Sequence, residues 1–126
     1  FKRYNDEYGH QSGDVCLKKV AQAITRAVKR STDLVARYGG EEFAIILPNT
    51  DIEGAQRVAM DIQSEIRTLA IPHCRSLIDT CVTVSLGVAS VADVTDTTPD
   101  ALIAAADRGL YRAKYEGRNR TCAETF

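Results

Sequence analysis

Two short apolar runs separated by a two-glycine turn constrain the fold of this chain more than any other feature. The runs cover positions 34–38 and 43–47, and the residues between them, 39–42, read Gly-Gly-Glu-Glu. Apolar runs of this length joined by Gly-Gly are typical of a β-hairpin, because glycine reaches the backbone angles that a tight turn requires. Pro48 closes the second run. The sequence therefore predicts a hairpin in the first half of the chain.

Three segments carry apolar residues at helical spacing. The first covers 14–29 and the second covers 51–69, each with an apolar stripe opposite a polar face. The third opens with Thr-Pro-Asp at 98–100, which combines a cap, a proline in the first turn and an early acid. We expect it to reach about residue 115 and to end at Gly117.

Two or three further strands are expected in the second half of the chain. Residues 82–89 form a strand-like apolar run, and Gly87 within it indicates a bulge or a close backbone approach. A weaker strand is predicted around 76–78, and a short last strand near Thr121. This order of elements predicts an α+β fold with a mostly antiparallel central sheet flanked by helices, in one domain covering 1–126.

Composition argues against several functional classes. Apolar residues make up 44% of the chain and charged residues 26%, and the net charge is −1. A chain so balanced in charge does not attract nucleic acid or an anionic membrane surface, and no apolar run is long enough to span a bilayer. We therefore expect no nucleic-acid partner and no direct membrane contact. An anionic ligand has to be held by a few placed cations.

The four cysteines give no sign of a metal site. They are Cys16, Cys74, Cys81 and Cys122. None of them forms a CxxC pair, which argues against structural zinc. Cys16 and Cys81 fall within apolar patterns, and free core thiols suit a reducing cytoplasm, where we expect this domain to lie.

Two adjacent acids stand in the glycine turn. Glu41 and Glu42 would repel each other in a purely structural turn, and bound Mg²⁺ would relieve that repulsion, since carboxylates are ligands that this ion accepts. Gly39 and Gly40 let the backbone come close to a bulky ligand. A hairpin whose acids are simply solvated stays the alternative.

A second polar patch lies at 5–14, where the sequence is Asn-Asp-Glu-Tyr-Gly-His-Gln-Ser-Gly-Asp. Asn and Asp together can recognise guanine, because a carboxylate accepts from both N1–H and the 2-amino group, a pair of donors that adenine lacks. The alternative is a loop that ends in a helix cap, with Asp14 as the cap or as an acid of the first turn.

A third patch lies at the end of the last predicted helix. Lys114 and Arg118 stand a helical turn apart, although Gly117 is expected to end the helix between them. Two cations so placed can hold a polyphosphate. The alternative is a favourable interaction of positive charge with a helix C-terminus.

Together, these patches resemble the GGDEF family of diguanylate cyclases in order and in spacing. The resemblance covers nearly the whole chain, and the run at 82–87 fits it as well. The matching positions fall into three groups: Phe1, Lys2, Asn5, Asp6, Gly9, His10, Gly13 and Asp14; then Arg37, Tyr38, Gly39, Gly40, Glu41, Glu42 and Phe43; then Ala106, Asp107, Leu110, Tyr111, Ala113, Lys114, Gly117, Arg118 and Asn119.

The resemblance implies both a fold and a reaction. Family members have a palm-like fold, similar to that of polymerases and class III nucleotidyl cyclases. They join two GTP into cyclic di-GMP and release two pyrophosphates. Each domain holds one GTP, so two domains have to meet face to face as a homodimer. Two Mg²⁺ ions suit this chemistry, because they polarise the phosphoryl group and lower the pKa of the attacking 3′-hydroxyl.

The resemblance also implies a role for each matched site residue. Glu41 would bind metal and act as the general base, Glu42 would support the metal site, and Lys2 would hold phosphate during catalysis. The guanine contacts would be Asn5, His10 and Asp14, and the phosphate contacts would be Lys114 and Arg118. The glycines that give the ligand room would be Gly39 and Gly40.

One part of the family pattern falls before the first residue of this chain. Family members carry a further metal-binding Asp on a first strand, just ahead of the position that Phe1 matches. We therefore expect the domain to be truncated at its N-terminus. On this expectation, residues 1–126 alone would not turn over GTP.

Arg30 and Asp33 match the family's RxxD product-inhibition motif, just ahead of the first hairpin strand. Arg can donate to guanine O6 and N7 and Asp can accept from N1 and N2, so bound cyclic di-GMP would cross-link domains. Some members add an arginine from the next helix. Here Asp61 occupies that place, and Arg57 is the candidate substitute. The alternative is a helix-terminal Arg followed by a turn Asp.

Three functions stay open from the sequence. The first is an active cyclase within a larger protein, which is compatible with a membrane anchor elsewhere in that protein. The second is an inactive module that binds GTP or cyclic di-GMP as a regulatory domain. The third is a structural dimerisation domain, which would leave the Asn5/Asp14 and Lys114/Arg118 pairs without a role.

Overall fold

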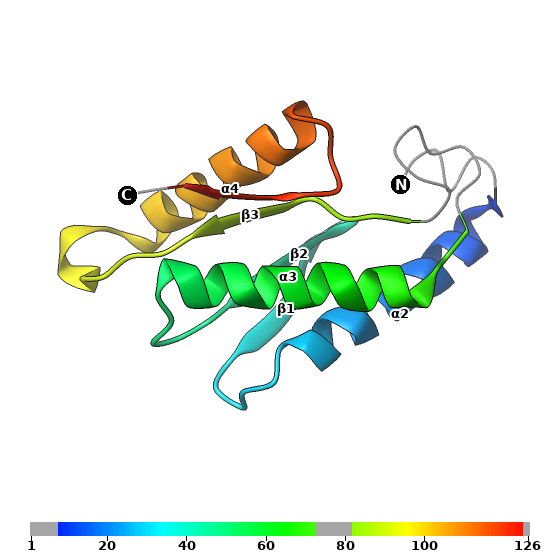
Figure 1. Cartoon of the computed structure of the whole chain (residues 1–126), viewed down its shortest axis with the longest axis horizontal. Coiled ribbons are helices and arrows are strands. Elements are labelled where there is room, and N and C mark those ends of the chain that lie inside the picture. Colours follow the sequence, from blue (N-terminus) through cyan, green and yellow to red (C-terminus); the bar gives the residue numbers. More distant parts are fainter. Residues whose placement is uncertain (1–7, 73–81, 125–126) are drawn as a thin grey trace. The chain divides into compact units, whose positions relative to one another are not determined.

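The computed structural model describes residues 8–72 and 82–124 (Figure 1). Its helices and strands alternate as an α+β fold, as the sequence predicted. The elements are α2 (His10–Ala27), β1 (Leu34–Gly39), β2 (Glu42–Ile46), α3 (Ile52–Leu69), β3 (Leu86–Ala89), a 3-10 turn η1 (Val94–Asp96), α4 (Pro99–Tyr115) and β4 (Thr121–Glu124).

The chain divides into two compact units. Among the described residues, the first unit contains 8–48, 64–72 and 82–83, and the second contains 49–63 and 84–124. Helix α3 contributes its second part to the first unit and its first part to the second. Across 8–72 and 82–124, no helix combines the length and the apolar character needed to cross a membrane.

The hairpin in the first unit confirms the strongest prediction from sequence. Strands β1 and β2 pair antiparallel, from Leu34 opposite Ile46 to Arg37 opposite Phe43, and the register shifts before Gly39 pairs with Glu42. The turn itself is therefore only two residues long. Arg37 Nε donates to the Gly40 carbonyl at 2.6 Å, which holds the turn closed.

Helix α2 packs in the first unit through the apolar stripe that the sequence indicated. Cys16, Val20 and Ile24 are buried along it. The helix begins at His10, whereas the sequence predicted a start at residue 14. Gly9, with φ 86°, is the residue just before the helix, and no side chain caps the helix there. Asp14 is therefore not the cap, and the first turn holds no acid, so the helix-cap alternative was wrong.

The second unit is built on a parallel strand pair. Leu86 of β3 pairs with Thr121 of β4, and the ladder continues to Ala89 opposite Glu124. Helix α4 lies against this pair (Figure 1) and buries Ala105 and Ala113. The predicted last strand is confirmed, and α4 has the Thr98 cap that the sequence predicted, with its hydroxyl accepting from Ala101 N at 3.2 Å.

The sheet differs from the prediction in extent and pairing. Within 8–72 and 82–124, the strands form two two-stranded sheets, one antiparallel and one parallel, rather than one mostly antiparallel sheet. The strand predicted at 82–89 is observed only at Leu86–Ala89, because its hydrogen-bonding partner β4 has only four residues to pair with it. The weak strand predicted around 76–78 lies outside the described residues.

Gly87 permits the close contact between β3 and α4. A Cβ atom at this position would collide with the Ala106 carbonyl oxygen and the Leu110 nitrogen, which are backbone atoms of α4. Gly109 faces the same interface, and a Cβ there would lie 2.7 Å from the Cys122 carbonyl oxygen. The close backbone approach predicted at Gly87 is confirmed.

We expect Gly87→Ala to lower the free energy of unfolding by about 2–3 kcal/mol, because rigid helix backbone has to move to admit the methyl group. Urea denaturation followed by circular dichroism measures the change. Gly39→Ala is the matched control, because nothing lies within 4 Å of a Cβ built there. An equal loss of stability in the two variants would contradict the packing role of Gly87.

A candidate guanine-nucleotide site

The glycine turn places two carboxylates at the tip of the hairpin. Gly40 has φ 53°, a left-handed conformation that favours glycine, and open space surrounds both Gly39 and Gly40. Glu41 and Glu42 follow directly and are exposed. Neither carboxylate forms a hydrogen bond or an ion pair with the described residues, so both remain available to a ligand.

These two acids fit a magnesium site that is completed by a substrate. The residues at 8–72 and 82–124 contain no group of three or more His, Cys, Asp or Glu side chains able to hold a metal. Mg²⁺ does not require such a cage, because it commonly binds one or two carboxylates together with waters and phosphate oxygens. The donor set at the hairpin tip suits that mode of binding and not structural zinc.

The candidate guanine contacts are only partly described. Lys2 and Asn5 lie outside the described residues. His10 is the first residue of α2. Asp14 lies one turn further along this helix and is exposed, and its carboxylate has no hydrogen-bond or ion-pair partner among residues 8–72 and 82–124. A carboxylate held on a helix and open to solvent is able to accept hydrogen bonds from a base.

The two candidate phosphate ligands lie on either side of the end of α4. Lys114 is in the last turn, and the chain then passes through left-handed backbone at Gly117 (φ 126°) and Arg118 (φ 63°). Arg118 N donates to the Ala113 carbonyl at 2.8 Å, which fixes this reversal. Both cationic side chains are exposed, and neither is paired within the described part of the chain.

The predicted inhibitory residues are brought together, and they bind each other. Arg30 Nη2 donates to Asp33 Oδ1 at 2.7 Å and to the Pro48 carbonyl at 2.8 Å. The Asp33 side chain is only 3% exposed, whereas Arg30 is 48% exposed. Its hydrogen bond with Asp33 raises the pKa of Arg30, so the guanidinium stays charged. A guanine that binds here has to compete with this ion pair.

The candidate residues belong to different units. Asp14, Glu41, Glu42 and the Arg30–Asp33 pair lie in the first unit. Lys114 and Arg118 lie in the second.

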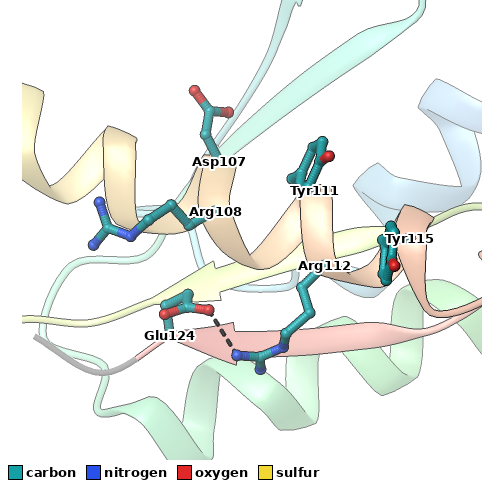
Figure 2. A pocket seen from close by; sticks show the side chains of 6 residues that line it. All are labelled: Asp107, Arg108, Tyr111, Arg112, Tyr115 and Glu124. Carbon is teal, nitrogen blue, oxygen red and sulfur yellow. Dashed lines mark hydrogen bonds and ion pairs between the residues drawn. The ribbon is translucent and has the colours of Figure 1, made fainter.

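The structure also contains a pocket that no sequence pattern predicted. It measures about 600 Å³ and lies beside α4 and β4 (Figure 2). Its lining residues are Asp107, Arg108, Tyr111, Arg112, Tyr115 and Glu124. The sequence pattern that could have indicated it is a pair of tyrosines four residues apart, Tyr111 and Tyr115, in a predicted helix. Both lie outside the buried stripe of α4 and are exposed.

Comparisons with known proteins identify the family of this chain. The family described as "Diguanylate cyclase, GGDEF domain" matches residues 1–120. The response regulator PleD of Caulobacter vibrioides is 41% identical over 121 residues, which are 94% of this chain and 26% of that protein. Diguanylate cyclase A of Treponema denticola is 39% identical over 120 residues, 95% of this chain and 31% of that protein. The chain thus spans less than a third of these two relatives.

Solved structures show the same fold. The active GGEEF domain of a diguanylate cyclase from Vibrio cholerae superposes with a TM-score of 0.84 at 30% identity, covering 98% of this chain and 75% of that one. The GGDEF domain of DgcB from Caulobacter crescentus, in complex with c-di-GMP, gives a TM-score of 0.83 at 34% identity, covering 97% and 70%. With its Gly-Gly-Glu-Glu-Phe turn at 39–43, this chain belongs to the GGDEF family of diguanylate cyclase domains.

Proposed function

We propose that this chain is the catalytic domain of a diguanylate cyclase, which condenses two GTP into cyclic di-GMP and two pyrophosphates. The observation that carries the proposal is the glycine turn, where Glu41 and Glu42 are exposed and unpaired among the described residues. A turn with only a structural role gains nothing from two adjacent repelling carboxylates. The Vibrio cholerae domain called active has the same five-letter turn, GGEEF.

Glu41 would hold the metal, and Glu42 would support the site from the next position. Two Mg²⁺ ions, when bound, polarise the phosphoryl group and acidify the attacking hydroxyl. Glu41 is also exposed at the tip of the hairpin, so its carboxylate would be able to accept the proton of the ribose 3′-hydroxyl. The 3′-oxygen then forms a bond to the α-phosphorus of the other GTP, and the bond from that phosphorus to pyrophosphate breaks.

The substrate contacts divide between base and phosphates. Asp14, with Asn5, would accept from the guanine N1–H and 2-amino groups, and His10 would shape that pocket. Lys114 and Arg118, with Lys2, would hold the phosphates and offset the negative charge that develops on them. Gly39 and Gly40 leave room for the triphosphate, because neither has an atom within 4 Å of a Cβ position.

A palm-like arrangement and a homodimer complete the proposal. Each domain would bind one GTP, so each 3′-hydroxyl has to come from the partner's substrate. The α+β fold and its likeness to the GGEEF and DgcB domains support the palm-like arrangement. The 3′-hydroxyl and α-phosphate need to approach to about 3–3.5 Å for this step, which requires two domains to meet in one orientation.

The intact protein that carries this domain provides the test. Incubation with GTP and Mg²⁺, followed by chromatography, is expected to give cyclic di-GMP and pyrophosphate, and ATP is expected to give no cyclic product. Binding of GTP without any turnover would instead favour a regulatory module that senses the nucleotide. Absence of both GTP binding and turnover would contradict the cyclase and the regulatory module alike.

We expect Arg30→Ala to raise the concentration of cyclic di-GMP that half-inhibits the enzyme by about tenfold or more, since an Arg–guanine pair discriminates by about 1–3 kcal/mol. Initial rates at increasing product concentration measure this. Arg26→Ala is the matched control, because it breaks a surface ion pair with Glu65 at 3.2 Å without touching the RxxD motif. Equal inhibition of the wild-type and Arg30→Ala enzymes would contradict an inhibitory role for Arg30.

A further inference from the structure

The connection between α4 and β4 contains more left-handed backbone than the end of a helix requires (Figure 1). The Arg118 N–H donates to the Ala113 carbonyl at 2.8 Å, as in a Schellman cap, and such a cap needs one left-handed residue, here Gly117. Two more follow, Arg118 at φ 63° and Asn119 at φ 49°. Asparagine adopts this conformation fairly readily, but for arginine it is unfavourable. The surrounding structure therefore has to hold Arg118 in place.

The Arg120 side chain folds back onto this turn. Its Nε donates to the Arg118 carbonyl at 3.0 Å. Because the Arg118 N–H is bound to Ala113, the peptide groups on both sides of the Arg118 Cα are now held by hydrogen bonds. The direction in which the Arg118 side chain leaves the backbone is thus fixed relative to the last turn of α4, which carries Lys114.

Gly117 leaves the space that the Arg120 guanidinium fills. Gly117 has φ 126°, and a Cβ built on it would lie 2.7 Å from Arg120 Nη2 and 3.4 Å from Arg120 Cζ. A side chain at 117 would push the guanidinium away and would also strain the backbone. The glycine and the arginine therefore belong to one arrangement around Arg118.

The backbone of Arg120 is anchored to the neighbouring strand. Its carbonyl accepts from the N–H of Leu86, the first residue of β3, at 3.0 Å. Within 8–72 and 82–124, Arg120 makes no ion pair that would draw its guanidinium away from the turn. Arg112, in contrast, is paired with Glu116 and Glu124. Arg120 is thus the arginine whose side chain supports Arg118.

We infer that Arg120 is a positioning residue, which holds the left-handed turn so that the Arg118 guanidinium is presented to the phosphates of GTP. This role rests on the proposed function, in which Lys114 and Arg118 bind the triphosphate. Arg120 acts through Arg118 and does not itself contact the substrate. Without its hydrogen bond the turn becomes mobile, and GTP binding then has to order it.

The first test needs no nucleotide. Arg120→Ala in the intact protein is expected to speed amide exchange at Arg118 about fivefold, because the turn opens more often once one of its two hydrogen bonds is lost. Hydrogen–deuterium exchange followed by mass spectrometry of peptides that contain Arg118 measures this. Arg108→Ala is the matched control, because Arg108 is exposed on α4 and makes no bond within the described residues. Unchanged exchange in Arg120→Ala would overturn the inference.

The second test measures binding of α,β-methylene-GTP, whose bond to the leaving group cannot break. Arg120→Ala is expected to weaken this binding about two- to tenfold, the effect of having to order one long side chain on binding. Arg120→Lys keeps the charge and loses the Nε–H donor, so it is expected to bind as weakly as Arg120→Ala. Full recovery in Arg120→Lys would overturn the inference, because positive charge alone would then explain the effect.

A double-mutant cycle with Arg118→Ala separates positioning from direct contact. Arg120→Ala is expected to have no further effect on analogue binding in the Arg118→Ala background. A further loss as large as in the wild-type background would overturn the inference and identify Arg120 as a phosphate ligand. Cyclase turnover is assayed separately, so absence of cyclic di-GMP together with the expected exchange and binding would contradict only the proposed reaction.

Discussion

Glu41→Gln is expected to lower the conversion of GTP to cyclic di-GMP by about 10²–10⁴-fold, the range over which a positioned general base contributes. The amide keeps the size of the side chain and removes the charge that would hold Mg²⁺ and accept the 3′-hydroxyl proton. Because Glu41 is exposed and follows the Gly40 turn, the fold should not change. Initial rates of product formation measure the loss.

The control for this prediction is Glu53→Gln, which removes an acid from the first turn of α3. It is expected to keep full turnover, with at most the small loss of stability that follows from removing a favourable charge at a helix start. Normal turnover by Glu41→Gln would show that the turn carboxylate takes no part in the chemistry. The hairpin acids would then be solvated groups of a structural turn.

Lys114→Ala is expected to lower kcat/KM for GTP by about a hundredfold, because a charged hydrogen-bonding group that is removed from a ligand site commonly costs about 2–5 kcal/mol. Arg118→Ala is expected to act in the same direction. Both residues are exposed and unpaired in the described structure, so the effect should appear in kinetics and not in stability. Steady-state rates over a range of GTP concentrations measure it.

The competing interpretation gives a different pattern. If Lys114 serves only as a favourable charge at the C-terminus of α4, Lys114→Ala lowers the free energy of unfolding by about 0.3–1 kcal/mol and leaves kcat/KM unchanged. Lys19→Ala, an exposed lysine in α2, is the control for removing a surface cation. Unchanged kinetics in Lys114→Ala and Arg118→Ala would remove the phosphate contacts from the proposal.

Local features of the fold were predictable from sequence. The Gly-Gly turn specified the hairpin, because the two strands are neighbours in the chain and the turn fixes their register. Thr98 and Pro99 specified the start of α4 within one residue. The start of α2 was missed, because Gly9 ends the preceding chain through its backbone alone and offers no polar cap to recognise.

Non-local features were not predictable. The parallel pairing of β3 with β4 joins segments on either side of α4, and no local pattern states which strands will meet. Arg30 and Asp33 are three residues apart in the chain, so their ion pair is a local contact. The bond from Arg30 to the Pro48 carbonyl, in contrast, depends on where β2 ends. The α4 pocket could not be predicted, because the spacing of apolar residues alone does not show that Tyr111 and Tyr115 are exposed.

A crystal structure of the intact protein with Mg²⁺ and a GTP analogue that cannot react would show directly whether the turn carboxylates hold the metal. We expect a magnesium ion about 2.0–2.1 Å from a carboxylate oxygen of Glu41, with phosphate oxygens of the analogue as further ligands. Guanine is expected beside Asp14, and the phosphates beside Lys114 and Arg118. A bound analogue whose phosphates lie far from the 39–42 turn, with Glu41 and Glu42 facing only water, would contradict it.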